Sequence, residues 1–180
     1  MPVAQNSCPV DAGRMDTILQ ALASSLLARV SPEEQVVLLG IRSRGMPLAD
    51  RLADRIQALT GQQVPVGTLD ITLYRDDLTE MIGSPIVRPT EIPFSLQGRT
   101  VVLVDDVLYT GRTIRAALDA LLDHGRPRRV MLLVLADRDG RELPIQADLV
   151  GLRLEVPPGH RVKVRMKEID GEDGVTLEAC

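Results

Sequence analysis

The chain has 180 residues and a net charge of −4, with 44% hydrophobic and 26% charged residues. These values argue against a disordered chain, and no apolar run reaches the length of a membrane span. Aromatic residues make up only 2% of the chain, which argues against a base-stacking platform for single-stranded nucleic acid.

Two further features bear on the compartment. The N-terminus lacks a basic-then-apolar leader, so we expect a cytoplasmic protein with no membrane partner. Cys8 and Cys180 lie near opposite ends of the chain, which fits neither a metal spacing nor a disulfide framework.

The first half of the chain predicts alternating helices and strands. Residues 1–13 look irregular, and helical spacing follows over 14–29. After a break at 31–34, the continuous apolar run 36–41 predicts a strand buried on both faces. A short loop over 42–45 leads into a predicted helix over 46–59.

The second half continues the alternation. We predict a strand over 64–74 and an irregular, mobile loop over about 75–97, since long loops of this kind often serve as lids. A strand over 100–105, a helix over 113–123 and a strand over 130–136 follow. Shorter strands are predicted near 147–151, 161–168 and 175–178, which completes a single domain over 14–180.

Strand–helix alternation with apolar strands predicts an α/β fold with a doubly wound, mainly parallel sheet flanked by helices. Ligands bind such sheets beyond the carboxyl ends of the strands. The segments 42–45, 74–77, 105–113 and 137–141 should therefore converge, and each is rich in charge.

The segment 101–113 is the most informative. Four apolar residues end at Asp105 and Asp106, and a turn containing Thr110 and Gly111 leads into the next helix. Main-chain N–H groups at such a helix start suit a phosphate, and paired acids suit a diol or a hydrated metal. The alternative is a simple strand exit with helix-capping acids.

The string Asp-Asp-Val-Leu-Tyr-Thr-Gly-Arg-Thr resembles the phosphoribosyl-pyrophosphate (PRPP) signature of type I phosphoribosyltransferases. The resemblance implies that Asp105 and Asp106 face the ribose hydroxyls, directly or through Mg²⁺ held mainly by the substrate. It also implies a 5-phosphate site formed by the rest of the string: Val107, Leu108, Tyr109, Thr110, Gly111, Arg112 and Thr113.

The other three segments receive roles from the same resemblance. Ser43, Arg44 and Gly45 would bind pyrophosphate, although they could equally be a solvated basic turn. Arg75 would be a catalytic residue that closes over the leaving group, or else one half of a surface Arg–Asp pair. A base pocket would be formed by Ala136, Asp137 and Arg138, of which the last two could instead be a structural ion pair.

Longer strings are similar to the bifunctional PyrR family of pyrimidine operon attenuation regulators and uracil phosphoribosyltransferases. They include Asp-Ile-Thr-Leu-Tyr-Arg-Asp-Asp over 70–77 and Arg-Glu-Leu-Pro-Ile over 141–145, and the likeness covers about residues 15–175. It implies that uracil and PRPP give UMP and pyrophosphate, that the protein is a homodimer or homotetramer, and that it binds pyr leader mRNA.

The RNA-binding pattern of that family is only partly present. Members usually carry Gly-His ahead of Arg-Glu-Leu-Pro-Ile, a basic residue after it and Lys in a later Gly-Lys-Asn step. This chain has Asp139 and Gly140, Gln146 and Leu152 at these positions, and its first helix presents Gln20, Ala21 and Ser24 where the family often has Thr-Arg and His. Arg29 and Arg141 match basic positions of the family, and Arg153 could replace part of the lost phosphate contacts. Because phosphate contacts dominate RNA affinity, we hypothesise a weakened or absent RNA role.

Two alternative functions stay open at this point. One is an RNA-binding attenuator in which PRPP and UMP act mainly as effectors. The other is a phosphoribosyltransferase for a different nucleobase.

Overall fold

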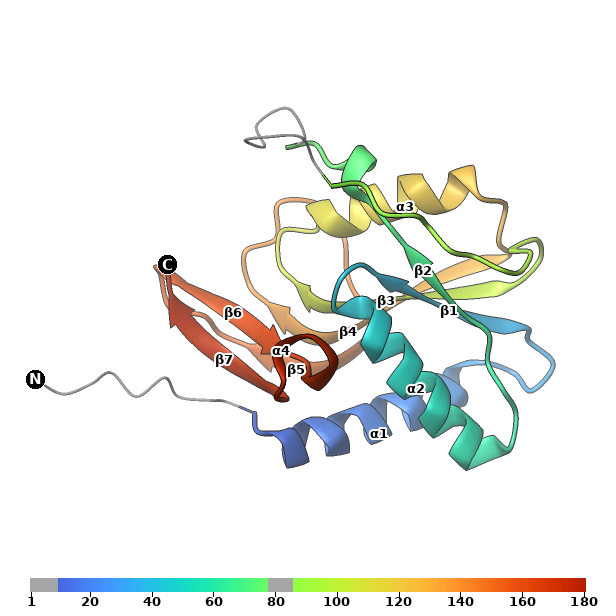
Figure 1. Cartoon of the computed structure of the whole chain (residues 1–180), viewed down its shortest axis with the longest axis horizontal. Coiled ribbons are helices and arrows are strands. Elements are labelled where there is room, and N and C mark those ends of the chain that lie inside the picture. Colours follow the sequence, from blue (N-terminus) through green and yellow to red (C-terminus); the bar gives the residue numbers. More distant parts are fainter. Residues whose placement is uncertain (1–9, 78–85) are drawn as a thin grey trace, which may run out of the picture.

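The computed structural model describes residues 10–77 and 86–180. Its centre is a five-stranded sheet in the order β2-β1-β3-β4-β5, and all neighbouring strands run parallel (Figure 1). The strands are β1 (Val36–Ile41), β2 (Val66–Leu69), β3 (Thr100–Leu108), β4 (Arg129–Arg138) and β5 (Leu149–Leu154). The predicted parallel α/β sheet is confirmed.

Helices cover both faces of the sheet. α1 (Ala12–Arg29) and α2 (Gly45–Thr60) lie on one face, and α3 (Arg112–Asp123) lies on the other (Figure 1). α1 begins at Ala12 rather than at residue 14, because the Asp11 carboxylate accepts a hydrogen bond from the Arg14 amide at 2.8 Å. Within the described residues, no helix is long and apolar enough to cross a membrane.

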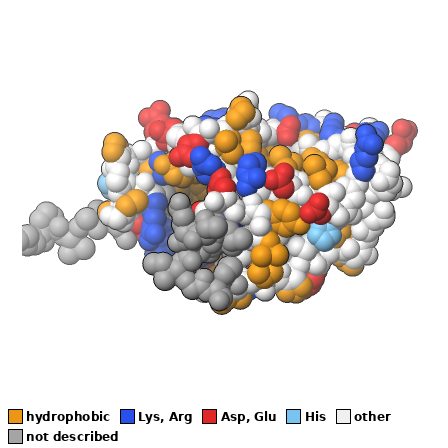
Figure 2. Space-filling view, turned by 90° about the horizontal axis from the view of Figure 1, so that it is seen from above, with side chains coloured by type: hydrophobic (Ala, Val, Ile, Leu, Met, Phe, Trp, Pro, Cys, Tyr) orange, Lys and Arg blue, Asp and Glu red, His pale blue; other side chains and the backbone are white. Residues whose placement is uncertain are grey.

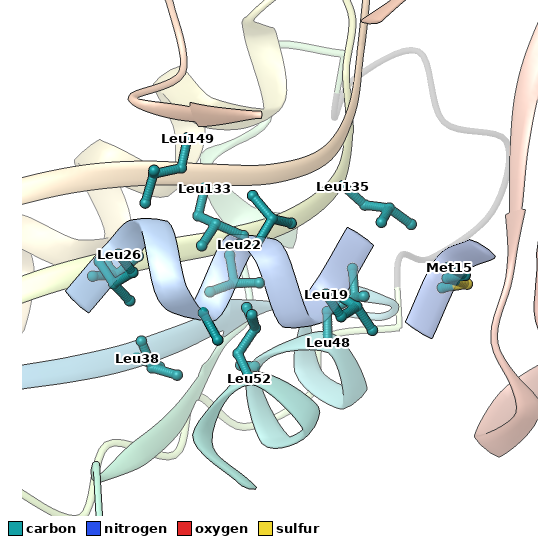
Figure 3. Packing of buried hydrophobic residues seen from close by; sticks show 14 of the residues in the cluster. Met15, Leu19, Leu22, Leu26, Leu38, Leu48, Leu52, Leu133, Leu135 and Leu149 are labelled. Atoms are coloured by element: carbon teal, nitrogen blue, oxygen red, sulfur yellow. The ribbon is translucent and has the colours of Figure 1, made fainter. Parts of the chain in front are cut away.

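The face covered by α1 and α2 holds the larger core cluster. The α1 side chains Met15, Leu19, Leu22 and Leu26 follow helical spacing and are all buried. Figure 3 shows this stripe beside leucines from β4, β5 and α2: Leu133, Leu135, Leu149, Leu48 and Leu52. Aliphatic packing therefore holds the two helices against the strands that carry the candidate site.

The C-terminal segment forms a second, antiparallel sheet. β6 (His160–Arg165) and β7 (Gly174–Ala179) pair with each other, and the short helix α4 (Lys167–Asp170) lies between them. The strand predicted over 161–168 thus ends early, because the Asp170 carboxylate accepts the Met166 amide at 2.9 Å and stabilises a helical turn. Met166 is fully buried and joins the main core.

The strand predicted over 64–74 is wrong beyond Leu69. Residues Thr72–Tyr74 form a 3₁₀ turn, η1, instead. Asp70 causes the break, since its carboxylate accepts the Thr72 amide at 2.8 Å and offers the chain an alternative to strand pairing.

The loop predicted over about 75–97 falls partly outside the described residues, at 78–85. Its later part lies along the edge of the sheet, where Glu91 exchanges two main-chain hydrogen bonds with Thr68. Leu96 is buried in the cluster beneath α3. Residues 90–97 therefore pack along the sheet, and the mobility of the loop stays a prediction.

Candidate active site

A crevice of about 250 Å³ lies beyond the carboxyl ends of β1, β2 and β3. Three of the four predicted segments meet there, since the lining includes Arg42, Ser43, Arg44, Arg75, Asp105, Asp106, Val107 and Thr113. The crevice lining does not include Ala136, Asp137 or Arg138. Acidic and basic side chains alternate over the molecular face seen from above (Figure 2).

A larger cavity, of about 710 Å³, lies at the opposite end of the sheet. Its lining mixes aliphatic side chains with uncharged polar residues, and its charged residues are Glu33, Glu34 and a single arginine, Arg99. The smaller crevice instead combines several arginines, two carboxylates and a helix start. A phosphorylated sugar needs that second combination, so we place the candidate site in the smaller crevice.

Asp105 and Asp106 lie within β3, which continues to Leu108 rather than ending at residue 105. The strand continues because β4 also continues, with Leu108 paired to Asp137. The Asp105 carboxylate accepts the Asp106 amide at 2.9 Å, and the Asp106 carboxylate accepts the Val107 amide at 2.9 Å. Both acids line the crevice near the carboxyl end of β3.

The two acids form an electrostatically demanding pair. Asp105 is only 6% exposed, and burial raises its pKa above the ordinary value, as does the adjacent Asp106 carboxylate. A divalent cation would offset both effects, and Mg²⁺ commonly takes one or two carboxylates and completes its shell with substrate oxygens. The residues therefore fit Mg²⁺, although no three-ligand cage exists within the described part of the chain.

The phosphate loop ends at the first residue of α3. Gly111 has a φ of +93°, a conformation that favours glycine, and it directly precedes the helix. Gly111 has no side chain to cap the helix, and the Thr110 hydroxyl accepts the amide of Arg112 at 3.3 Å. The amide of Thr113, in the same turn and at the crevice, is left for an anion, which supports the predicted 5-phosphate site.

Side chains of the phosphate loop point to neighbouring loops. Arg112 donates from Nε to Glu142 at 2.6 Å and also pairs with Asp76. The Tyr109 ring lies 4.0 Å from the guanidinium of Arg138. The Arg112 side chain is therefore engaged by two acids, and its amide donates to the Thr110 hydroxyl at 3.3 Å.

The first loop, 42–45, packs closely against the sheet. A Cβ atom at Gly45 would lie 2.2 Å from the Val104 carbonyl oxygen, so only glycine allows α2 to start here. The peptide between Arg42 and Ser43 is cis. Arg44 is 28% exposed and pairs with Asp170 of α4, 126 residues further along the chain.

Arg75 also lines the crevice. It donates from Nε to Asp77 at 2.8 Å, so the Arg–Asp pair considered from sequence exists. The side chain of Arg75 is 41% exposed. It can therefore exchange its surface partner for a bound anion at little cost.

The segment predicted as a base pocket is organised by two arginines. Asp137 is 5% exposed, and its two carboxylate oxygens accept from Arg141 at 2.7 Å and from Arg153 at 2.9 Å. The anticipated ion pair at this strand end thus involves these arginines rather than Arg138. Ala136 is fully buried.

Arg141 and Arg153, both predicted to contact RNA, differ in their surroundings. Arg141 is 26% exposed and also donates to the main-chain carbonyl of Tyr109 in the phosphate loop. Arg153 is 68% exposed. It lines a depression of about 500 Å³ with the third predicted residue, Arg29.

Sequence reasoning missed two acids near the crevice. Asp70 lines it, and its carboxylate accepts the amide of Thr72, which precedes the long loop, and the amide of Arg88, which lies within it. Burial opposes the ionisation of Asp70, but these hydrogen bonds and Arg42 outweigh it and lower its pKa. The available signal was an acid within a segment that otherwise predicts a strand, residues 64–74. No sequence pattern marks Asp170, the second acid.

Comparison with known proteins agrees with this geometry. Residues 11–164 match the phosphoribosyl transferase domain family. The hypoxanthine-guanine phosphoribosyltransferase of Bacillus anthracis has a similar fold, with a TM-score of 0.71, 17% identity and coverage of 96% of this chain and 98% of that one. Fold and site together define a phosphoribosyltransferase.

Sequence relatives are more specific. The chain is 55% identical to the bifunctional protein PyrR of Pelotomaculum thermopropionicum over 159 residues, or 88% of each chain. It is 54% identical to that of Thermus aquaticus over 168 residues, or 93% of each. The chain belongs to the PyrR family of bifunctional proteins.

Proposed function

We propose that the protein is a uracil phosphoribosyltransferase that forms UMP and pyrophosphate from uracil and PRPP. The observation that carries the proposal is the convergence of Asp105, Asp106, Arg44 and the first turn of α3 around one crevice. A phosphate, a ribose and a pyrophosphate need these groups at one site. Family membership favours uracil over other nucleobases.

Each group of residues at the crevice has its own role in this reaction. The amides of the first turn of α3 bind the 5-phosphate, and Asp105 and Asp106 orient the ribose hydroxyls. As the bond from the sugar C1 to pyrophosphate breaks and the bond to the uracil nitrogen forms, Asp106 balances positive charge on the sugar. Arg44 and Arg75 neutralise the leaving pyrophosphate.

Mg²⁺ would be held by the substrate oxygens together with Asp105 and Asp106, and it would stabilise the charge of the pyrophosphate. Uracil would be recognised beside Ala136, Asp137 and Arg138, largely through main-chain groups, because the Asp137 carboxylate is already paired.

Steady-state consumption of PRPP against a panel of nucleobases tests the proposal. We expect turnover that requires both uracil and Mg²⁺. Asp106→Asn should lower kcat by about a hundredfold or more, since it removes charge stabilisation from the transition state. Unchanged turnover in Asp106→Asn and in Arg44→Ala would refute the site assignment, and preference for a purine or orotate would refute the choice of uracil.

We also propose RNA binding as a second function, in keeping with the bifunctional family. The depression that contains Arg29 and Arg153 supports this function, because both arginines lie on one surface and Arg153 is exposed. With few basic residues there, binding of pyr leader mRNA should be weak and should fall only moderately as salt increases, since the salt dependence scales with the number of phosphate contacts. Binding that is undetectable or insensitive to salt in a filter assay would contradict it.

A further inference from the structure

Arg44 of the pyrophosphate loop has an unusual set of partners. Its Nη2 donates to Asp170 at 2.9 Å, while its Nε is buried and has no hydrogen-bond partner among the described residues. A guanidinium offers five N–H donors in a fixed plane. One interaction therefore fixes the orientation of the group and leaves donors for another anion.

Asp170 is itself held firmly. One carboxylate oxygen accepts from Arg44, and the other accepts the amide of Met166, whose side chain is fully buried in the main core. The Met166 amide lowers the pKa of Asp170, burial opposes this, and Arg44 lowers it further. The carboxylate that meets Arg44 is thus ionised at neutral pH and anchored to the core.

The turn that carries Asp170 is also fastened to α2, the helix that Arg44 precedes. Arg51 of α2 donates to both carboxylate oxygens of Glu168, at 2.8 and 2.7 Å, and to both oxygens of Asp173, at 3.0 and 2.8 Å. Figure 1 shows α4 near the first turn of α2. The C-terminal unit and the pyrophosphate loop therefore form one connected body.

We propose that Asp170 is a positioning residue for pyrophosphate binding, which holds the Arg44 guanidinium so that its remaining donors meet the pyrophosphate of PRPP. The inference rests on the proposed function. Holding a long side chain in place before binding reduces the entropy that is lost on binding. The C-terminal hairpin thereby contributes to the site without touching the substrate.

Binding of Mg·PRPP and Mg·pyrophosphate by calorimetry, with initial-rate kinetics, tests this role. Asp170→Ala should raise the Kd for pyrophosphate and the KM for PRPP by about three- to tenfold. We expect kcat and the KM for uracil to stay near the wild-type values. Asp170→Asn keeps an acceptor oxygen and should recover part of the loss.

Two controls separate positioning from damage to the fold. Glu172→Ala removes an exposed acid of the same turn, which pairs with Arg165 instead, and should behave as wild type. In an Arg44→Ala background, Asp170→Ala should have no further effect, because its action passes through Arg44.

Three results would overturn the proposal that Asp170 positions Arg44. Unchanged affinity in Asp170→Ala would do so, as would an equal loss in the Arg44→Ala background. Tighter binding would show that Asp170 competes with pyrophosphate for Arg44. Wild-type protein that fails to bind PRPP would instead refute the proposed function itself, so the two failures are distinguishable.

Discussion

Asp105 and Asp106 are neighbours in sequence but have different surroundings. Asp105 is buried at 6% exposure, whereas Asp106 is half-buried at the crevice. Burial and the adjacent carboxylate raise the pKa of Asp105, so the folded state takes up its proton more readily than the unfolded chain does. The site is therefore built at some cost in stability.

The raised pKa of Asp105 predicts how the stability of the protein without Mg²⁺ depends on pH. Protonated Asp105 makes its full contribution to stability below its ordinary pKa of 3.8. This contribution is lost as pH rises through the raised pKa that the group has in the folded protein. Asp105→Asn cannot ionise, so it should unfold at a higher temperature than wild type at pH 7. The difference should shrink towards pH 4 in thermal unfolding scans, and a variant less stable at pH 7 would contradict the account.

Arg141 gives a second prediction at this scale. It joins Asp137 to the main-chain carbonyl of Tyr109 and thus braces the phosphate loop from outside the crevice. Arg141→Met should weaken UMP binding by about tenfold, since it removes charge-assisted hydrogen bonds that hold the loop.

A matched control is available for Arg141. Arg55 also pairs with one carboxylate, that of Asp16, and with one main-chain carbonyl, that of Arg51, but it lies on α2 away from the phosphate loop. Arg55→Met should leave UMP affinity unchanged in calorimetry. An equal loss in both variants would mean that the effect is a general one on folding.

At the scale of elements, α1 stabilises the sheet without touching the site. Leu22 is 3% exposed and lies between the strands and α2 (Figure 3). Leu22→Ala should lower the free energy of unfolding by about 2–5 kcal/mol, because it leaves a cavity in the core. Denaturant unfolding measures the loss, and the KM for PRPP should not change. A large rise in KM would contradict the separation of core and site.

The elements also show where sequence reasoning succeeds. β1 has the predicted limits at both ends, because a run buried on both faces begins after a break and stops at charged residues. β3 was predicted to end at its first acid. It continues to Leu108 because β4 supplies hydrogen-bond partners there, and only the neighbouring strand determines that.

At the scale of the whole molecule, the parallel order of the sheet is what brings segments 42–45, 75 and 105–113 to one crevice. That convergence could be predicted, since carboxyl ends of parallel strands meet at one edge. The contact between Arg44 and Asp170 could not, because it joins residues 126 positions apart and neither periodicity nor a motif marks it. Assembly as a homodimer or homotetramer stays a prediction.

The most direct test of the central claim is a crystal structure of the protein with UMP. We predict that the 5-phosphate lies at the amides of residues 110–113 and that the ribose hydroxyls meet Asp105 and Asp106. A nucleotide bound elsewhere, with this crevice empty, would contradict the account.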